Sequence, residues 1–160
     1  MTEIRVERSA FAVTITATTP VAAPIERVWD VLGDTAAYPE WNPFVRRFEG
    51  ELVEGARIEV DLQPSDKEPT TMRPRLVEVV PGRSFTWLGH VGISGLLDGR
   101  HTFSVVPDDT RPGESVLVQH ERLSGLLTPL FTSLLTVETP RAFEASNDAL
   151  AARATAGRPS

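Results

Sequence analysis

Apolar residues recur at spacings of three and four along the last part of the chain. The stripe consists of Leu126, Leu127, Leu130, Phe131, Leu134, Phe143, Leu150 and Ala154, with Asn147 at one position among them. Such spacing places one apolar face on a long helix. The pattern therefore predicts a C-terminal helix over residues 125–154, and a helix with a single apolar face needs a sheet to bury it.

Two prolines fall inside this predicted helix. Pro129 lies in its first turns, where proline is tolerated, whereas Pro140 is interior and removes one backbone hydrogen bond. We expect a kink or break between Thr136 and Thr139 for this reason.

The residues before the helix alternate between apolar and polar with period two, as half-buried strands do. Residues 1–10 are polar and are expected to be frayed. Pro74 predicts an edge strand or a bulge, because proline cannot donate to a β-ladder. Seven strands are predicted, near residues 11–18, 45–49, 57–62, 70–80, 84–88, 100–106 and 116–123.

Two short helices are predicted between the first and second strands. Ile25, Val28, Trp29 and Leu32 form an apolar stripe that Gly33 ends, and a second short helix stops before Pro39. The fold class is therefore α+β: a curved, seven-stranded antiparallel sheet that grips the C-terminal helix, with a cavity between them.

Composition narrows the possible functions. The 160 residues predict one domain over 1–155 and a disordered tail over 156–160. No cysteine is present, and the net charge of −6 argues against nucleic acid as a partner. Apolar runs are shorter than the roughly 20 residues that span a bilayer, and no signal peptide is evident, so we expect a cytoplasmic protein without membrane insertion.

Candidate chemistry lies in the last two predicted strands. A hairpin centred near residue 111 pairs His101 with Glu121 and Phe103 with Gln119, and all four side chains face inward. A histidine beside a carboxylate on an apolar face is a plausible general acid/base unit. The alternative is a purely structural pair, in which each buried polar side chain serves only as the partner of the other.

The remaining candidates are aromatic, apolar or basic. Trp41 belongs to a rigid aromatic segment that either closes one end of the core or lines the mouth of the cavity. Neither a nucleophile elbow nor a phosphate-binding glycine spacing occurs, and we predict neither a metal site nor a cofactor. The predicted ligand-binding residues are Trp41, Phe44, Arg73, Trp87, Phe103, Gln119, Leu130 and Leu134.

Four segments carry a resemblance to a known superfamily: Ala23–Trp29, Tyr38–Phe44, Gly99–Phe103 and Glu121–Leu127. With the order of elements, they make residues 10–155 similar to the START-like, or SRPBCC, superfamily. This superfamily includes the birch-pollen-allergen-like proteins and the polyketide cyclase/dehydrase group. The resemblance implies the helix-grip fold and a deep apolar cavity that holds lipids, sterols, polyketides or plant hormones.

Three functions are compatible with these observations. The first is binding of a polyketide-, lipid- or sterol-like molecule in the cavity, by a monomer or a homodimer. The second is a cyclase or dehydratase of the polyketide type, with His101 and Glu121 as acid/base groups. The third is a co-chaperone-like interaction module, although the outer sheet face is rich in Arg, Glu, Asp and Thr.

Overall fold

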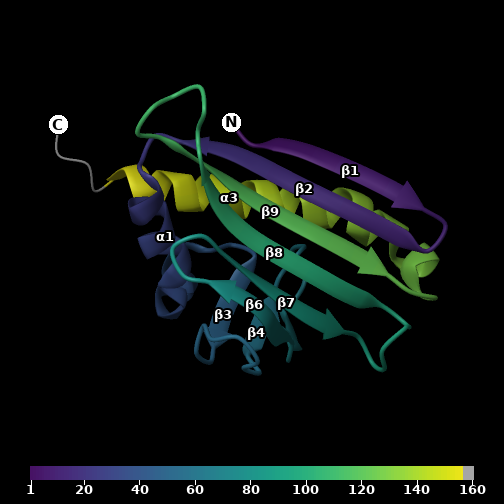
Figure 1. Ribbon diagram of the computed structural model, residues 1–160. Coiled ribbons are helices and arrows are strands. Elements are labelled where there is room, and N and C mark those ends of the chain that lie inside the picture. Colours follow the sequence, from purple (N-terminus) through teal and green to yellow (C-terminus); the bar gives the residue numbers. More distant parts are fainter. Residues whose placement is uncertain (157–160) are drawn as a thin grey trace.

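A long C-terminal helix lies across one face of a six-stranded antiparallel sheet in the computed structural model, which describes residues 1–156 (Figure 1). In spatial order, the strands of this sheet are β1 (Glu3–Ser9), β2 (Ala12–Val21), β9 (Ser115–Ser124), β8 (Asp98–Pro107), β7 (Ser84–His90) and β6 (Arg75–Val80). A smaller sheet contains β3 (Val45–Glu49), β4 (Glu59–Leu62) and β5 (Thr70–Met72).

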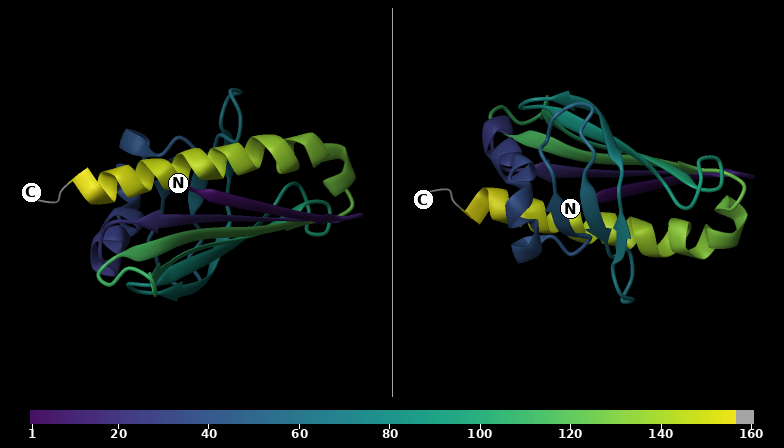
Figure 2. Two further views of the ribbon diagram at one scale, coloured as in Figure 1. Left: turned by 90° about the horizontal axis from the view of Figure 1, so that it is seen from above. Right: turned by 90° about the horizontal axis from the view of Figure 1, so that it is seen from below.

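The helical elements occupy two parts of the chain. Between β2 and β3 lie α1 (Ile25–Gly33), a 3-10 turn (Thr35–Ala37) and α2 (Tyr38–Trp41). Two short helical segments follow α1 where one was predicted, and the predicted stop before Pro39 is wrong: Pro39 lies in the first turn of α2, where a missing N–H is tolerated. After β9 come a 3-10 turn (Thr128–Phe131), a π-helical turn (Leu134–Glu138) and α3 (Thr139–Ala156). Figure 2 shows the sheet curving along the C-terminal helix, with α1 and the smaller sheet on the remaining sides. The predicted helix-grip fold is confirmed.

The strand count differs from the prediction in two places. The segment 1–10 is not frayed, because Glu3–Ser9 forms β1 and pairs antiparallel with β2. The predicted strand 70–80 is two strands, because Pro74 separates β5 from β6. The two halves then join different sheets, since β5 pairs with β4 and β6 pairs with β7.

Before Pro140, where the sequence predicts a kink or break, the structure has a π-helical turn that leads directly into α3. Pro140 has no N–H, so the regular helical bond at that position is missing. The turn ends where Thr139 donates both its backbone N–H and its hydroxyl to the carbonyl of Leu134, the latter at 3.0 Å. Ala156 ends α3, and the rest of the predicted tail, residues 157–160, lies outside the described residues.

Only the second half of the predicted apolar stripe is buried. Phe143, Asn147, Leu150 and Ala154 of α3 face the sheet, as predicted. Leu126 and Leu130, by contrast, are 69% and 77% exposed. The cause is geometric: this part of the chain is a loop and a 3-10 turn with about three residues per turn, so the α-helical spacing does not apply there.

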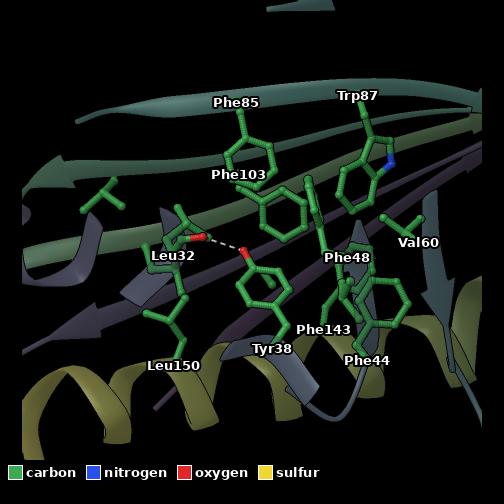
Figure 3. Packing of buried hydrophobic residues seen from close by; sticks show 14 of the residues in the cluster. Leu32, Tyr38, Phe44, Phe48, Val60, Phe85, Trp87, Phe103, Phe143 and Leu150 are labelled. Atoms are coloured by element: carbon green, nitrogen blue, oxygen red, sulfur yellow. Dashed lines mark hydrogen bonds between the residues drawn. The ribbon is translucent and has the colours of Figure 1, made fainter. Parts of the chain in front are cut away.

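Aromatic rings fill the space between the sheet and α3. Figure 3 shows rings from the larger sheet, from the segment after α2 and from α3 pointing toward one another. The buried members are Phe44, Phe48, Phe85, Trp87, Phe103 and Phe143. The predicted cavity is therefore occupied by the protein's own side chains. Within residues 1–156 no helix is long and apolar enough to cross a bilayer.

Candidate functional site

The β8–β9 hairpin places His101 directly opposite Glu121. The register is the predicted one, with Phe103 opposite Gln119 in the next inward pair. The side chain of His101 is fully buried, and that of Glu121 is 10% exposed. His101 Nδ1 lies 3.7 Å from Glu121 Oε2, which is beyond hydrogen-bonding distance.

Aromatic rings enclose the imidazole of His101. Phe103 stacks on it with ring centroids 4.2 Å apart, and Phe143 stacks at 4.9 Å. Trp87 presents an edge at 5.0 Å, and Phe44 lies at 6.1 Å. These rings remove water from the imidazole, and desolvation disfavours its charged form. Burial accordingly lowers the pKa of His101 to about 3, so the ring is neutral near pH 7.

A chain of side-chain amides fixes the proton on this ring. Asn147 Nδ2 donates to the backbone carbonyl of Ala17 at 3.4 Å and to Thr19 Oγ1 at 3.0 Å. A backbone carbonyl can only accept, so Asn147 must turn Oδ1 toward Gln119. Gln119 Nε2 donates to that oxygen at 2.5 Å, which leaves Gln119 Oε1 facing His101.

Gln119 Oε1 lies 3.1 Å from His101 Nε2 and can only accept a hydrogen bond. The neutral imidazole therefore carries its proton on Nε2, and Nδ1 has the lone pair. Nδ1 is buried and has no hydrogen-bond partner within residues 1–156. The carboxyl group of Glu121 faces that lone pair.

The Glu121 carboxyl group lies against Gly99 of β8 in a nearly dry position. No hydrogen bond to its side chain is present in the described part of the chain, and burial raises the pKa of Glu121 to about 8. The carboxyl is thus largely protonated at neutral pH. A proton donor and the His101 lone pair therefore face each other across a short gap.

The amide network continues to the segment that carries Phe44. Gln119 Nε2 also lies 3.5 Å from Ser146 Oγ, and Ser146 donates to Asn42 Oδ1 at 3.1 Å. Asn42 Oδ1 accepts the backbone N–H groups of Phe44 and Val45, both at 2.9 Å. One buried hydrogen-bond network therefore connects the backbone that carries the Phe44 ring to the group that sets the tautomer of His101.

Five of the predicted site residues lie around His101: Phe44, Trp87, Phe103, Gln119 and Glu121. The structure does not bring Arg73 or Leu130 to them. Arg73 is on the surface and pairs with Glu59 at 2.8 Å, and Leu130 is exposed. Leu134 is half-buried in the π-helical turn, and half-buried Trp41 packs edge-on against Tyr38.

Sequence reasoning did not assign a role to Asn42, Ser146 or Asn147. A signal existed for Asn147, which occupies a position of the apolar stripe of the C-terminal helix. A buried amide at such a position requires polar partners on the facing sheet. Ser146 and Asn42 offer no comparable pattern, because their partners lie on elements far apart in the sequence.

Solved structures of several proteins share this fold. The Zhui aromatase/cyclase from Streptomyces sp. R1128 is 17% identical, with a TM-score of 0.71 over 92% of this chain and 99% of that one. A START superfamily protein from Mycobacterium smegmatis is 18% identical, with a TM-score of 0.66 over 88% and 96%. The di-domain ARO/CYC StfQ of the steffimycin biosynthetic pathway is 19% identical, with a TM-score of 0.64 over 91% of this chain and 50% of that one.

Identities this low show the shared fold and no more. No curated protein sequence matches the chain. The family model described as polyketide cyclase / dehydrase and lipid transport matches residues 12–155, from the start of β2 almost to the end of α3. This chain therefore belongs to the polyketide cyclase/dehydrase and lipid transport family.

Proposed function

We propose that this protein binds a hydrophobic, ring-containing small molecule between the sheet and α3, and that His101 and Glu121 anchor a polar atom of that molecule. The observation that carries the proposal is the pair itself. The His101 lone pair and the Glu121 carboxyl group face each other without a hydrogen-bond partner from residues 1–156. Family membership supports a ligand-binding or polyketide-processing role in general.

An unmatched buried polar group costs about 1–3 kcal/mol of folding free energy. A ligand carbonyl that accepts from protonated Glu121, or a ligand hydroxyl that donates to His101 Nδ1, would recover part of that cost. The aromatic walls formed by Trp87 and Phe103 suit a flat ring system. Space for it requires movement of Phe44 or Phe143, which come from outside the larger sheet.

Titration calorimetry with α-tetralone, a bicyclic aromatic ketone, tests this proposal. Replacing the carboxyl in Glu121→Leu should weaken binding roughly five- to tenfold, because one buried hydrogen bond is lost. The same variant should not be less stable, because a buried carboxyl without a partner is replaced by an apolar side chain of similar size. Glu78→Leu, at an exposed position of β6, is the matched control.

Equal affinity of wild type and Glu121→Leu for α-tetralone would refute the anchoring role. Loss of affinity together with loss of stability would point to a structural role instead. Weaker binding together with undiminished stability would show that the Glu121 carboxyl group serves ligand binding and not folding.

Acid/base catalysis is the second candidate, because a proton donor and an acceptor lie side by side. On a β-hydroxy ketone, His101 Nδ1 would take the proton from the carbon next to the carbonyl. Glu121 would protonate the hydroxyl, which leaves as water as the carbon–carbon double bond forms. Transfer of the proton from Nδ1 back to the carboxylate, now 3.7 Å away, would restore both groups.

The low basicity of His101 places this candidate second. A base with a pKa of about 3 abstracts a proton from carbon poorly at neutral pH. A tetralone that carries a hydroxyl β to its ketone is a direct test, since loss of water gives a fluorescent naphthol. Production of naphthol by wild type but not by Glu121→Gln would establish dehydration; equal rates in both would exclude this role for Glu121.

A further inference from the structure

An open groove of about 770 Å³ lies on the surface between the β4–β5 loop and the C-terminal helix. Figure 2 shows this loop projecting past the helix. One wall is formed by the π-helical turn and the start of α3, which contribute Val137 and Arg141. The opposite wall is formed by Pro43 just before β3, by Arg46 in β3 and by Lys67 from the loop. The groove is separate from the enclosed site around His101.

The groove combines unpaired cations with apolar surface. Arg141 and Lys67 make no ion pair within residues 1–156, and Arg46 donates a single hydrogen bond, to the Asn42 carbonyl at 2.9 Å. The acids Asp66 and Glu138 also line the groove. Three cations against two acids leave it with a positive balance, on a chain of net charge −6.

Apolar side chains lie among these charges. Val137 is 42% exposed and faces the groove together with Pro43, Pro64 and Ala142. An exposed apolar strip beside cations that make no ion pair within residues 1–156 suits a molecule with an apolar body and an anionic group. The π-helical turn forms part of the groove wall, through Val137 and Glu138, and such turns are frequent at functional sites.

Two aromatic rings beside His101 belong to residues that directly follow groove residues in the chain. Phe44 follows Pro43 in the chain, and its carbonyl accepts the backbone N–H of Gln63, another groove residue, at 2.9 Å. Phe143 follows Ala142 on α3. The two rings lie 5.1 Å apart, and each contacts the His101 ring, at 6.1 and 4.9 Å between centroids.

We propose that the groove binds the anionic end of an amphipathic ligand, a ring system with one carboxylate, sulfonate or phosphate group. Phe44 and Phe143 are the partition between this groove and the His101–Glu121 pair. The second statement rests on the proposed function of the interior, because a partition matters only if a ligand reaches His101. The first statement stands on the groove alone, and separate measurements test the two.

Two fluorescent probes with the same rings test the groove. Anilinonaphthalene sulfonate is an amphipathic anion, and N-phenylnaphthylamine lacks the sulfonate. The double variant Lys67→Gln/Arg141→Gln should weaken binding of the sulfonate roughly three- to tenfold, as expected for two exposed charges, and leave the neutral probe unchanged. Arg122→Gln, at an exposed position on β9, is the matched control and should change neither.

Unchanged affinity of the double variant for the sulfonate overturns the groove site, as does an equal loss for both probes. The α-tetralone titration separates this result from the interior. The double variant should bind α-tetralone like wild type, whereas Glu121→Leu should not. The groove site and the interior site can therefore be refuted independently of each other.

Chemical modification tests the partition. Diethyl pyrocarbonate acylates accessible neutral imidazoles, so exposed His90 and His120 should react in every variant while buried His101 is protected. Phe44→Ala should expose His101 to the reagent, and bound anilinonaphthalene sulfonate should restore its protection. Phe85→Ala removes an equally buried ring whose chain neighbours do not line the groove, and should leave His101 protected.

Peptide mapping by mass spectrometry reads the result. Reaction of His101 to the same extent in the Phe44→Ala and Phe85→Ala variants would mean that general loosening of the core, and not a path from the groove, exposes it. Continued protection in Phe44→Ala would also overturn the partition.

Discussion

Gly99 of β8 leaves the space that the carboxyl group of Glu121 occupies. A Cβ atom at position 99 would lie 3.0 Å from Glu121 Oε1 and 3.3 Å from Leu123 Cδ2. Real side chains rarely tolerate the shorter of these contacts. The backbone of Gly99 therefore helps to define where the one acidic group of the site can lie.

Gly99→Ala should displace the Glu121 side chain and lower the free energy of unfolding by roughly 1–2 kcal/mol, since added volume in a packed core causes strain. Urea denaturation measures the change. The double variant Gly99→Ala/Glu121→Ala removes the contact, so the effect of the alanine at position 99 should largely disappear there. Strict additivity of the two substitutions would contradict this account of the contact.

The amide chain predicts one tautomer of His101. Ring-nitrogen NMR should show the proton on Nε2 in wild type, and exposed His90 is the reference within the same molecule. Gln119→Leu removes the acceptor and should give a mixture of tautomers. The same change should lower the free energy of unfolding by roughly 1–3 kcal/mol, because a buried donor loses its partner. A proton on Nδ1 in wild type would show that the amide orientations are reversed.

Stability should vary with pH in a way that identifies both groups of the pair. The pKa of Glu121 is about 8 in the folded protein against 4.5 for the free side chain. The contribution of Glu121 to stability is therefore complete below pH 4.5 and is lost as the pH rises toward 8. The lowered pKa of His101, about 3 against 6.5, acts in the opposite direction: its contribution is complete above pH 6.5 and is lost as pH falls toward 3.

Between pH 4.5 and 6.5 the contributions of Glu121 and His101 to the slope of unfolding free energy against pH have opposite signs and cancel. Between pH 6.5 and 8 only Glu121 acts, so the free energy of unfolding should fall by about 1.4 kcal/mol per pH unit from this group. Urea denaturation of wild type and Glu121→Gln across pH 5–9 checks this, since the difference between them isolates Glu121. Parallel curves for the two proteins would refute the raised pKa.

Strand β1 should contribute measurably to stability. A chain that starts at Ala10 lacks the β1–β2 pairing and the hydrogen bonds of Thr2 with Thr19 and Asp148, both at 2.6 Å. We expect its free energy of unfolding to fall by about 3 kcal/mol, and Thr2→Val alone to cost about 1 kcal/mol. The shortened chain should also self-associate, because β2 becomes an unpaired edge. Unfolding at the same urea concentration as wild type would mean that β1 adds nothing.

Local patterns predicted most of the fold and one part of the site. The His101–Glu121 pairing follows from period-two alternation in two strands and the position of the loop between them, which are all local properties. Pro74 and Pro140 each mark a real discontinuity, because the missing N–H acts wherever the rest of the chain goes. The pairing of polar β1 is different, since it depends on an edge that only the folded sheet provides.

Three-dimensional packing decided what the sequence could not. The same apolar residues that could line an open cavity instead fill it, as the rings of Phe44 and Phe143 do around His101. Arg73 and Leu130 lie away from the site because their direction depends on a short strand and a 3-10 turn that alternation does not resolve. The groove joins loop and helix residues that are far apart in the chain.

The order of strands in the larger sheet has a consequence during synthesis of the protein. Strand β2, near the N-terminus, pairs along one side with β9, about a hundred residues later. The β1–β2 hairpin therefore leaves the ribosome early and waits for β9 with one row of backbone donors and acceptors unpaired. Completion of the sheet must follow synthesis of nearly the whole chain, and until then the hairpin exposes a strand edge of the kind that promotes aggregation.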